Sequence, residues 1–285
     1  MTTMLMDALS VDAELLPALS GDATVHSVFG SVVNVVAGQR LWSLGARHVP
    51  LAPGAIRVSV DDFDGLGLAP GTLVRAGQST IRLGEITVDL SGAARWRPEP
   101  IAGPVRADRF EAFAAELAAH GRPGGVVPGQ DPFSRAVAER IADGLSAIER
   151  AVVRDDPQAL GSAVARLVGL GTGLTPAGDD LLTGLAFASA TLGGSLSAIP
   201  AAVARAARPD ATHVVSVAAM REACSGRAVE PLSDVLATLC GRGPDGRTPE
   251  VVAALLAIGH TSGTDLAHGL AAAVRLHRTT PLTQK

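Results

Sequence analysis

Lysine and asparagine are nearly missing from this sequence, and tyrosine is missing altogether. Among the 285 residues, lysine occurs once, at Lys285, and asparagine once, at Asn34. Without an interior lysine the chain cannot build a Walker A phosphate loop or a pyridoxal Schiff base. Arginine side chains and backbone N–H groups are therefore the groups left to hold an anion.

Aromatic residues and positive charge are also scarce. Aromatics make up 3% of the chain, and 24 Lys and Arg against 28 Asp and Glu give a formal net charge of −4. Proteins that bind nucleic acids need a basic surface and usually aromatic rings for base stacking. We therefore expect no nucleic acid among the partners of this chain.

Cysteine is too sparse for a disulfide framework or a zinc site. Cys224 and Cys240 lie 16 positions apart, without a CxxC or His-paired spacing, which favours buried thiols in a reducing compartment. Residues 1–17 lack a basic region before an apolar stretch, so they do not resemble a signal peptide. These observations predict a cytoplasmic location.

An uncharged run over residues 181–204 is long enough to cross a bilayer of about 20 helical residues. Gly184, Gly193, Gly194 and Pro200 interrupt it. Such breakers predict two short buried helices rather than one membrane span.

Residues 23–97 are rich in Val, Ile and Thr, arranged in short alternating runs between Gly and Pro. This pattern is typical of strands joined by turns. We expect strands at 24–36 with a bend at Gly30, 40–44, 55–60, 72–76, and 80–90 with a turn near Gly84. They predict a β-rich domain over residues 23–100, either a small barrel or a sandwich, after an N-terminal extension of residues 1–22.

A Pro-rich stretch over residues 98–104 precedes an Ala-rich segment with helical spacing, so residues 105–280 are expected to form an α-helical domain. The fold class is then α+β. Four pairs place an N-cap side chain before a proline, and so predict helix starts: Asp131-Pro132, Asp156-Pro157, Thr175-Pro176 and Thr248-Pro249. Further helices are expected at 108–120, 198–207, 212–223, 229–239 and 263–278.

The most unusual segment is a glycine-rich turn that leads into a helix carrying two carboxylates, Gly169-Leu-Gly171-Thr172-Gly173-Leu-Thr175-Pro176-Ala-Gly178-Asp179-Asp180. Successive glycines let N–H groups turn inward, and a helix N-terminus adds positive potential, so a phosphate or carboxylate would fit there. Asp179 and Asp180 would then offer oxygens to Mg²⁺. The alternative is that the glycines end one helix while Thr175 caps the next.

A second segment of similar kind is Gly259-His260-Thr261-Ser262-Gly263-Thr264-Asp265, in which Ser262 and Asp265 have the spacing of a capping box. The two segments share Gly-x-Asp-x-x-x-Gly, at Gly178 and Gly263, with a constant offset of 85 residues. Three matched positions leave both duplication and coincidence open. In either case, we predict that the two turns converge on one pocket.

Three further sets of residues are candidates for the same chemistry. His260 is the best acid–base candidate of the seven histidines, none of which forms a metal-binding pattern. Thr212 and Ser216 lie on one helical face and would add hydroxyls. Asn34 lies within an apolar strand, where its amide needs a partner, so it would contact either a ligand or the other domain.

Together, the two glycine-rich segments resemble the motifs GLGxGLTPxGDD and GHTSGxD of the AllH-like family. The stretch from His26 to Asn34 resembles the β-rich part of that family, and the likeness extends over about residues 25–276. Ala177 stands where serine is common in the motif, so no hydroxyl is expected at that point.

This resemblance implies a subunit of an oxamate carbamoyltransferase, which works with partner subunits in purine and allantoin catabolism. The implied reaction is phosphorolysis of oxalurate to oxamate and carbamoyl phosphate, so the substrate is a small anion such as phosphate, carbamoyl phosphate or oxamate. From residue type, we expect Asp179 and Asp180 to orient a substrate amide or bind Mg²⁺, and His260 to shuttle a proton. The expected substrate-binding residues are Asn34, Gly171, Thr172, Gly173, Thr175, Gly178, Thr212, Ser216, Thr261, Ser262, Gly263 and Asp265. The alternative is a non-catalytic anion-binding or scaffold subunit.

Overall fold

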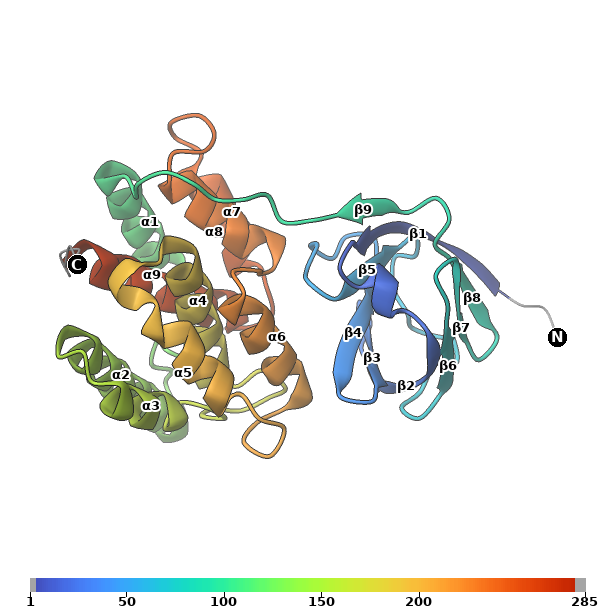
Figure 1. The fold of residues 1–285 in the computed structure, drawn as a ribbon, viewed down its shortest axis with the longest axis horizontal. Helices are drawn as coiled ribbons and strands as arrows, with labels where there is room; N and C mark the ends of the chain where they lie inside the picture. Colours follow the sequence, from blue (N-terminus) through green and yellow to red (C-terminus); the bar gives the residue numbers. More distant parts are fainter. Residues whose placement is uncertain (1–3, 280–285) are drawn as a thin grey trace. The chain divides into compact units, whose positions relative to one another are not determined.

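The computed structural model divides the chain into two compact units, Met1–Glu99 and Pro100–Lys285, and describes residues 4–279. The first unit is built from strands and the second from helices (Figure 1). The predicted α+β fold, with a β-rich part before a helical part, is thus confirmed.

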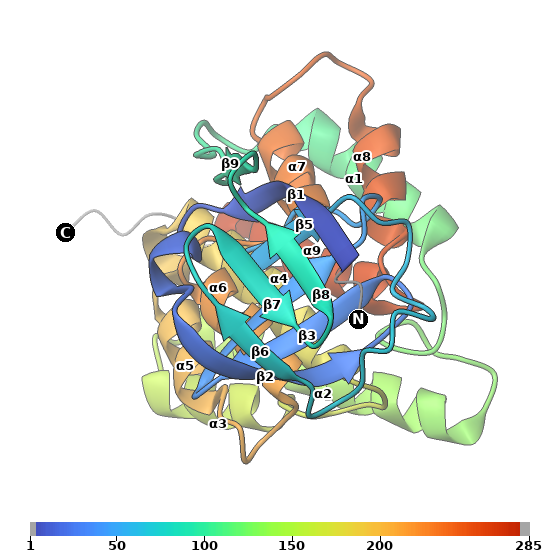
Figure 2. The ribbon, with the colours of Figure 1, turned by 90° about the vertical axis from the view of Figure 1, so that its right-hand side faces the viewer.

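A closed β-barrel forms the first unit. Within the described residues its strands are β1 (Met4–Asp12), β2 (Gly21–Val28), β3 (Val32–Ala37), β4 (Arg40–Gly45), β5 (Ala55–Val58), β6 (Leu73–Ala76), β7 (Thr80–Leu83), β8 (Ile86–Asp89) and β9 (Ala94–Trp96). The order is β5-β4-β3-β2-β6-β7-β8-β1-β9, and an additional β5–β1 pairing closes eight strands into a ring (Figure 2). Of the two predicted architectures, the barrel is therefore the one found.

Alternating side chains fill the barrel. Val33, Val35, Leu44 and Ile56 are fully buried, as expected where one face of each strand points into a barrel. Their neighbours along the strands are more exposed. The alternation that predicted these strands therefore reflects the interior of the barrel.

The predicted N-terminal extension of residues 1–22 is wrong. Residues 4–12 form β1, which pairs in parallel with β8, Met4 opposite Ile86, and antiparallel with β5, Val11 opposite Ile56. A short 3-10 helix, η1 (Leu16–Ala18), connects β1 to β2. The first strand of the chain is thus the one that closes the barrel.

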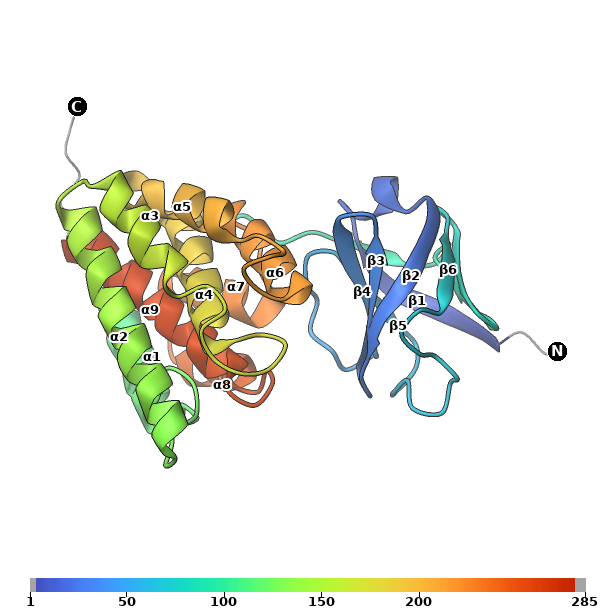
Figure 3. The same ribbon diagram turned by 90° about the horizontal axis from the view of Figure 1, so that it is seen from below.

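The described part of the second unit is helical. Its elements are α1 (Ala107–His120), α2 (Pro132–Val153), α3 (Pro157–Ala165), α4 (Ala177–Leu192), η2 (Gly194–Leu196), α5 (Ala198–Ala206), α6 (Val214–Cys224), α7 (Glu230–Leu239), α8 (Thr248–Leu256) and α9 (Ser262–Thr279). Helices α4 and α9 pack against each other, and α2 lies along α3 (Figure 3). Nearly every residue of α4 is buried, so α4 lies in the core of this unit.

Two of the four predicted N-caps are confirmed. The Asp131 side chain accepts from the Ser134 N–H at the start of α2, and Asp156 accepts from the Gln158 and Ala159 N–H groups at the start of α3. Thr175 does not cap α4, because the N-cap residue is Pro176. Thr248 does not cap α8 either, because it is already the first residue of that helix.

The uncharged run over residues 181–204 is split, as predicted, into α4 and α5 around Gly193 and Gly194, both of which have positive φ. Within residues 4–279 no helix has the length and apolar character needed to cross a membrane.

Candidate functional site

The turn before α4 requires its glycines. Gly169, Gly171 and Gly173 have φ angles of +73°, +125° and +89°, a region that side chains with a Cβ rarely adopt. A Cβ on Gly171 would also lie 2.7 Å from the Ala177 nitrogen. The N–H groups of residues 171–175 donate no hydrogen bond to any described residue. The turn therefore has backbone donors that no described group of the protein uses.

Asp179 is a structural link rather than a group free to bind Mg²⁺ or a substrate amide. Its side chain is 1% exposed. Its Oδ1 accepts from the Gly169 N–H at 2.7 Å, and its Oδ2 accepts from the Thr212 hydroxyl. Because both oxygens are engaged by protein donors, Asp179 and Thr212 together fix the turn to α4. Ser216 has a similar supporting contact, since its hydroxyl donates to the Leu174 carbonyl at 3.3 Å.

Gly178 and Gly263 serve close packing. A Cβ on Gly178 would lie 2.1 Å from the Leu167 oxygen, and one on Gly263 would lie 2.0 Å from the Leu255 oxygen. Their N–H groups already donate to Leu170 and to Ile258. These two amides are therefore not the donors that would meet an anion.

The two glycine-rich turns meet, as predicted. The Thr175 and Ser262 hydroxyls are 3.0 Å apart. A pocket of about 160 Å³ is lined from the first turn by Gly171, Thr172 and Ala177, from the second by Thr261, and from a third segment by Gly124, Asp131, Phe133, Ser134 and Val137. The pocket thus combines three parts of the chain that are far apart in sequence.

The third segment comprises the loop of residues 121–131 and the start of α2, and the sequence predicted only the Asp131 cap within it. The Val126 N–H donates to Asp265 Oδ1 at 2.7 Å, and Gly125 lies so close that a Cβ would be 2.3 Å from Asp265 Oδ2. The Arg122 guanidinium donates to the Gly259 carbonyl at 3.0 Å and to the His260 carbonyl at 3.4 Å. The predicted capping box is therefore wrong, because Asp265 binds this loop instead of closing onto Ser262.

Asp180 and Asp265 are buried carboxyl groups, 7% and 0% exposed. Burial raises the pKa of Asp180 well above its ordinary value; the Ser262 hydroxyl opposes this, and the charge of Asp265 adds to it. Burial also raises the pKa of Asp265 to about 6, although the hydrogen bond from the Val126 N–H lowers it. The Oδ2 atom of each is buried without a hydrogen-bond partner in the described chain. Both shifts have the same direction and the same main cause, the burial of the carboxyl group.

The 85-residue repeat has a structural counterpart in the packing of α4 against α9. A Cβ on Gly184 would lie 2.0 Å from the Leu266 oxygen, and a Cβ on Gly269 would lie 2.0 Å from the Leu181 oxygen. Position 269 is 85 residues after 184, and position 181 is 85 residues before 266, so the two contacts are equivalent under the offset. This reciprocity supports duplication, with Asp180 and Asp265 as equivalent positions.

The remaining candidates lie apart from this arrangement or on its surface. His260 is exposed in the turn before α9. Asn34 belongs to the barrel, where its amide donates to the Ser27 hydroxyl at 3.0 Å. In residues 4–279 no group of three or more His, Cys, Asp or Glu is placed to hold a metal ion. With both Asp179 oxygens engaged, the residues present do not fit the Mg²⁺ site considered above.

Comparison with known protein families agrees with the motifs. A model described as oxamate carbamoyltransferase subunit AllH matches residues 167–274, which contain both glycine-rich turns. A model described as the AllH family N-terminal domain matches residues 7–95, nearly the whole barrel. No solved structure matches the chain. On these two matches, the chain belongs to the AllH family.

Proposed function

We propose that this chain is one subunit of a carbamoyltransferase that interconverts oxalurate and phosphate with oxamate and carbamoyl phosphate. The family description supports this assignment. The observation that carries it is the pocket at which both glycine-rich turns meet residues 121–131. The pocket binds the small anionic substrate.

The two sides of the pocket suit a substrate with an anionic end and an amide end. The unused N–H groups of Gly171 and Thr172, together with the hydroxyls of Thr172 and Thr261, bind a carboxylate or phosphate. Each Asp131 oxygen accepts one hydrogen bond from Ser134, but unlike the buried Asp179 this carboxylate is exposed, so each oxygen keeps a second lone pair that accepts from an NH₂ group. The hydrogen bonds from Ser134 lower the pKa of Asp131, so it is ionised at neutral pH. Oxamate, oxalurate and carbamoyl phosphate each carry both kinds of group.

The proposed chemistry needs oxyanion stabilisation and one proton transfer. A phosphate oxygen attacks the carbamoyl carbon of oxalurate, the bond from that carbon to the oxamate nitrogen breaks, and the nitrogen takes a proton. Backbone donors aimed at developing charge contribute about 2.7–4 kcal/mol each in other enzymes. Asp180 supplies the proton through the paired hydroxyls of Thr175 and Ser262, and His260 exchanges protons with solvent.

The test is turnover of the complex reconstituted with its partner subunits. Asp131→Asn keeps an N-cap residue of similar strength but removes the charge, so we expect an intact fold and carbamoyl phosphate formation lowered by roughly tenfold or more. Asp156→Asn is the matched control, because it makes the same change at the α3 cap, outside the pocket. Equal activity of the two variants would contradict the proposal.

A non-catalytic, anion-binding scaffold subunit is the second candidate. It is favoured by the pocket lining, which contains no Lys, Arg or His among the described residues. In that case the partner subunits alone would turn over oxalurate, and adding this chain would change assembly or affinity without being required for the reaction.

A further inference from the structure

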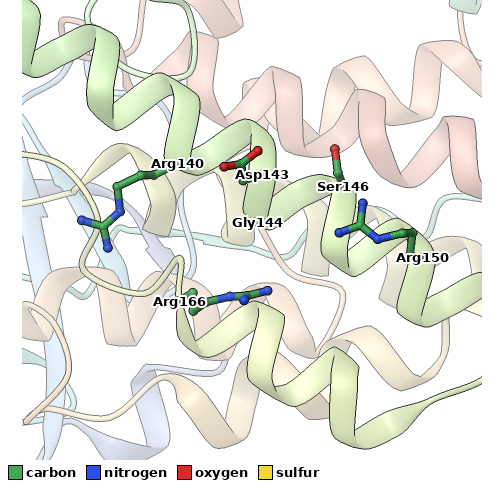
Figure 4. Close-up of a pocket in the computed structure, with 6 residues that line it drawn as sticks. All are labelled: Arg140, Asp143, Gly144, Ser146, Arg150 and Arg166. Atoms are coloured by element: carbon green, nitrogen blue, oxygen red, sulfur yellow. The ribbon is translucent and has the colours of Figure 1, made fainter.

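A second pocket, of about 420 Å³, lies between α2 and the end of α3. It is lined by Arg140, Asp143, Gly144, Ser146, Arg150 and Arg166. Figure 4 shows Arg150 and Arg166 extending from the two helices toward the same space, with Arg140 farther along α2. None of these residues lines the pocket at Thr261.

The three arginines have no ion-pair or hydrogen-bond partner among residues 4–279, as is also true of Arg82 and Arg154, but they differ from those two in lining one pocket together. Arg106 pairs with Asp108, and Arg208 pairs with Asp210. By contrast, the side chains of Arg140, Arg150 and Arg166 form no ion pair or hydrogen bond within residues 4–279. Three positive groups and Asp143 leave a local charge of +2 in a chain whose net charge is −4. Like charges gathered in this way repel one another unless an anion joins them.

Gly144 keeps the two helices close at this point. It lies within the 22-residue helix α2, where glycine costs about 1 kcal/mol relative to alanine. A Cβ there would lie 2.5 Å from Leu167 Cδ2. The glycine therefore lets α2 approach the residue after Arg166, and it leaves the pocket floor without a side chain.

We propose that this pocket binds a small, multiply charged oxyanion of the phosphate class. Guanidinium groups bind phosphate oxygens in pairs of parallel hydrogen bonds. Here guanidinium groups from two helices reach one concave space, and its volume is usual for a small-molecule site. This arrangement favours a compact ligand over an extended acidic segment. The proposal stands independently of the carbamoyltransferase assignment, because it uses none of the residues of the other pocket.

The test is calorimetric titration of the full chain with inorganic phosphate at constant ionic strength. We expect Arg150→Ser and Arg166→Ser each to weaken binding by about tenfold or more. Asp143→Asn should tighten it several-fold, because it removes the one negative charge of the lining. Arg154→Ser is the matched control: Arg154 is exposed at the end of the same helix and does not line the pocket.

Two results would overturn the proposal. The first is binding by Arg150→Ser and Arg166→Ser that equals wild type, or a loss in Arg154→Ser as large as theirs, since either would mean unspecific charge attraction. The second is a wild-type chain that binds no phosphate, together with Arg150→Ser and Arg166→Ser variants that no longer assemble with the partner subunits. That result would make this surface a docking site for an acidic protein segment. Thermal unfolding of each variant checks that the fold is retained.

Discussion

Gly184 of α4 and Gly269 of α9 occupy equivalent places where the two helices pack, each pressed against the backbone of the other helix. A Cβ on either one would lie 2.0 Å from a carbonyl oxygen of the opposite helix. Backbone atoms cannot move aside as a side chain can, so the two helices approach this closely only with glycine at both positions.

Gly184→Ala should therefore destabilise the helical unit by about 3 kcal/mol or more, at the upper end of the costs of overpacking. Gly161→Ala in α3 is the control, because a Cβ there meets nothing within 4 Å. That change should stabilise the protein by about 0.5–1 kcal/mol. Chemical denaturation of both variants measures the difference, and equal stabilities would show that the α4–α9 packing is looser than described.

Asp179→Asn should cost about 1–3 kcal/mol of folding free energy, since an amide cannot accept from both Gly169 and Thr212 and one buried donor loses its partner. A double-mutant cycle with Thr212→Val measures the Asp179–Thr212 term. Additive effects in the cycle would show that the two side chains do not interact.

Stability should fall as pH rises from about 4 to about 6, because Asp265 titrates near 6 in the fold and has an ordinary value of 3.8. The folded state binds the proton more tightly over this window, so losing it destabilises the fold, by roughly 2–3 kcal/mol in total. Asp180 shifts in the same direction.

Asp265→Asn keeps an oxygen for the Val126 N–H but does not titrate. Its stability relative to wild type should grow with pH up to about 6 and stay constant above. Asp143→Asn, an exposed change on α2, should show no such trend. Denaturation series across this range provide the measurement, and parallel curves for wild type and Asp265→Asn would contradict it.

Met6→Asp should unfold the barrel, whereas Leu5→Asp should leave it folded. Met6 is 3% exposed inside the barrel, and its neighbour Leu5 is 67% exposed on the outside. An unpaired carboxylate is costly in the interior and is solvated outside. Circular dichroism and proteolysis distinguish the two variants. A folded barrel in Met6→Asp would show that residues 4–12 are an extension and not a strand that the barrel needs.

Local patterns predicted most of the strands and helices, because the alternating or helical spacing of apolar residues reflects which side chains of an element are buried. They did not reveal β1, because its partners β5 and β8 lie far away in sequence, with Val11 opposite Ile56 and Met4 opposite Ile86, and its inward side chains include the small or polar Ala8 and Ser10. Nor did they reveal β9, a strand of three residues. Only pairing distant in sequence defines these two strands.

In the candidate site, too, local features could be predicted from the sequence and long-range contacts could not. The glycines at 169, 171 and 173 are legible from sequence because their backbone angles exclude other residues. Residues 121–131 read only as a Gly- and Pro-rich loop, since their link to Asp265 is a tertiary contact. The burial of Asp179 was equally out of reach, because the donors that surround it come from Gly169 and from Thr212, 33 positions away.

The position of α9 at the C-terminal end of the described chain determines how the protein can be made. Gly184 of α4 is buried against α9, so a chain still on the ribosome carries an apolar core helix whose partner has not yet been synthesised. The helical unit cannot complete its core before α9 has been synthesised, while the barrel strands are finished by residue 96. A transcript cut short before α9 would yield a folded barrel attached to an aggregation-prone remnant of the helical unit.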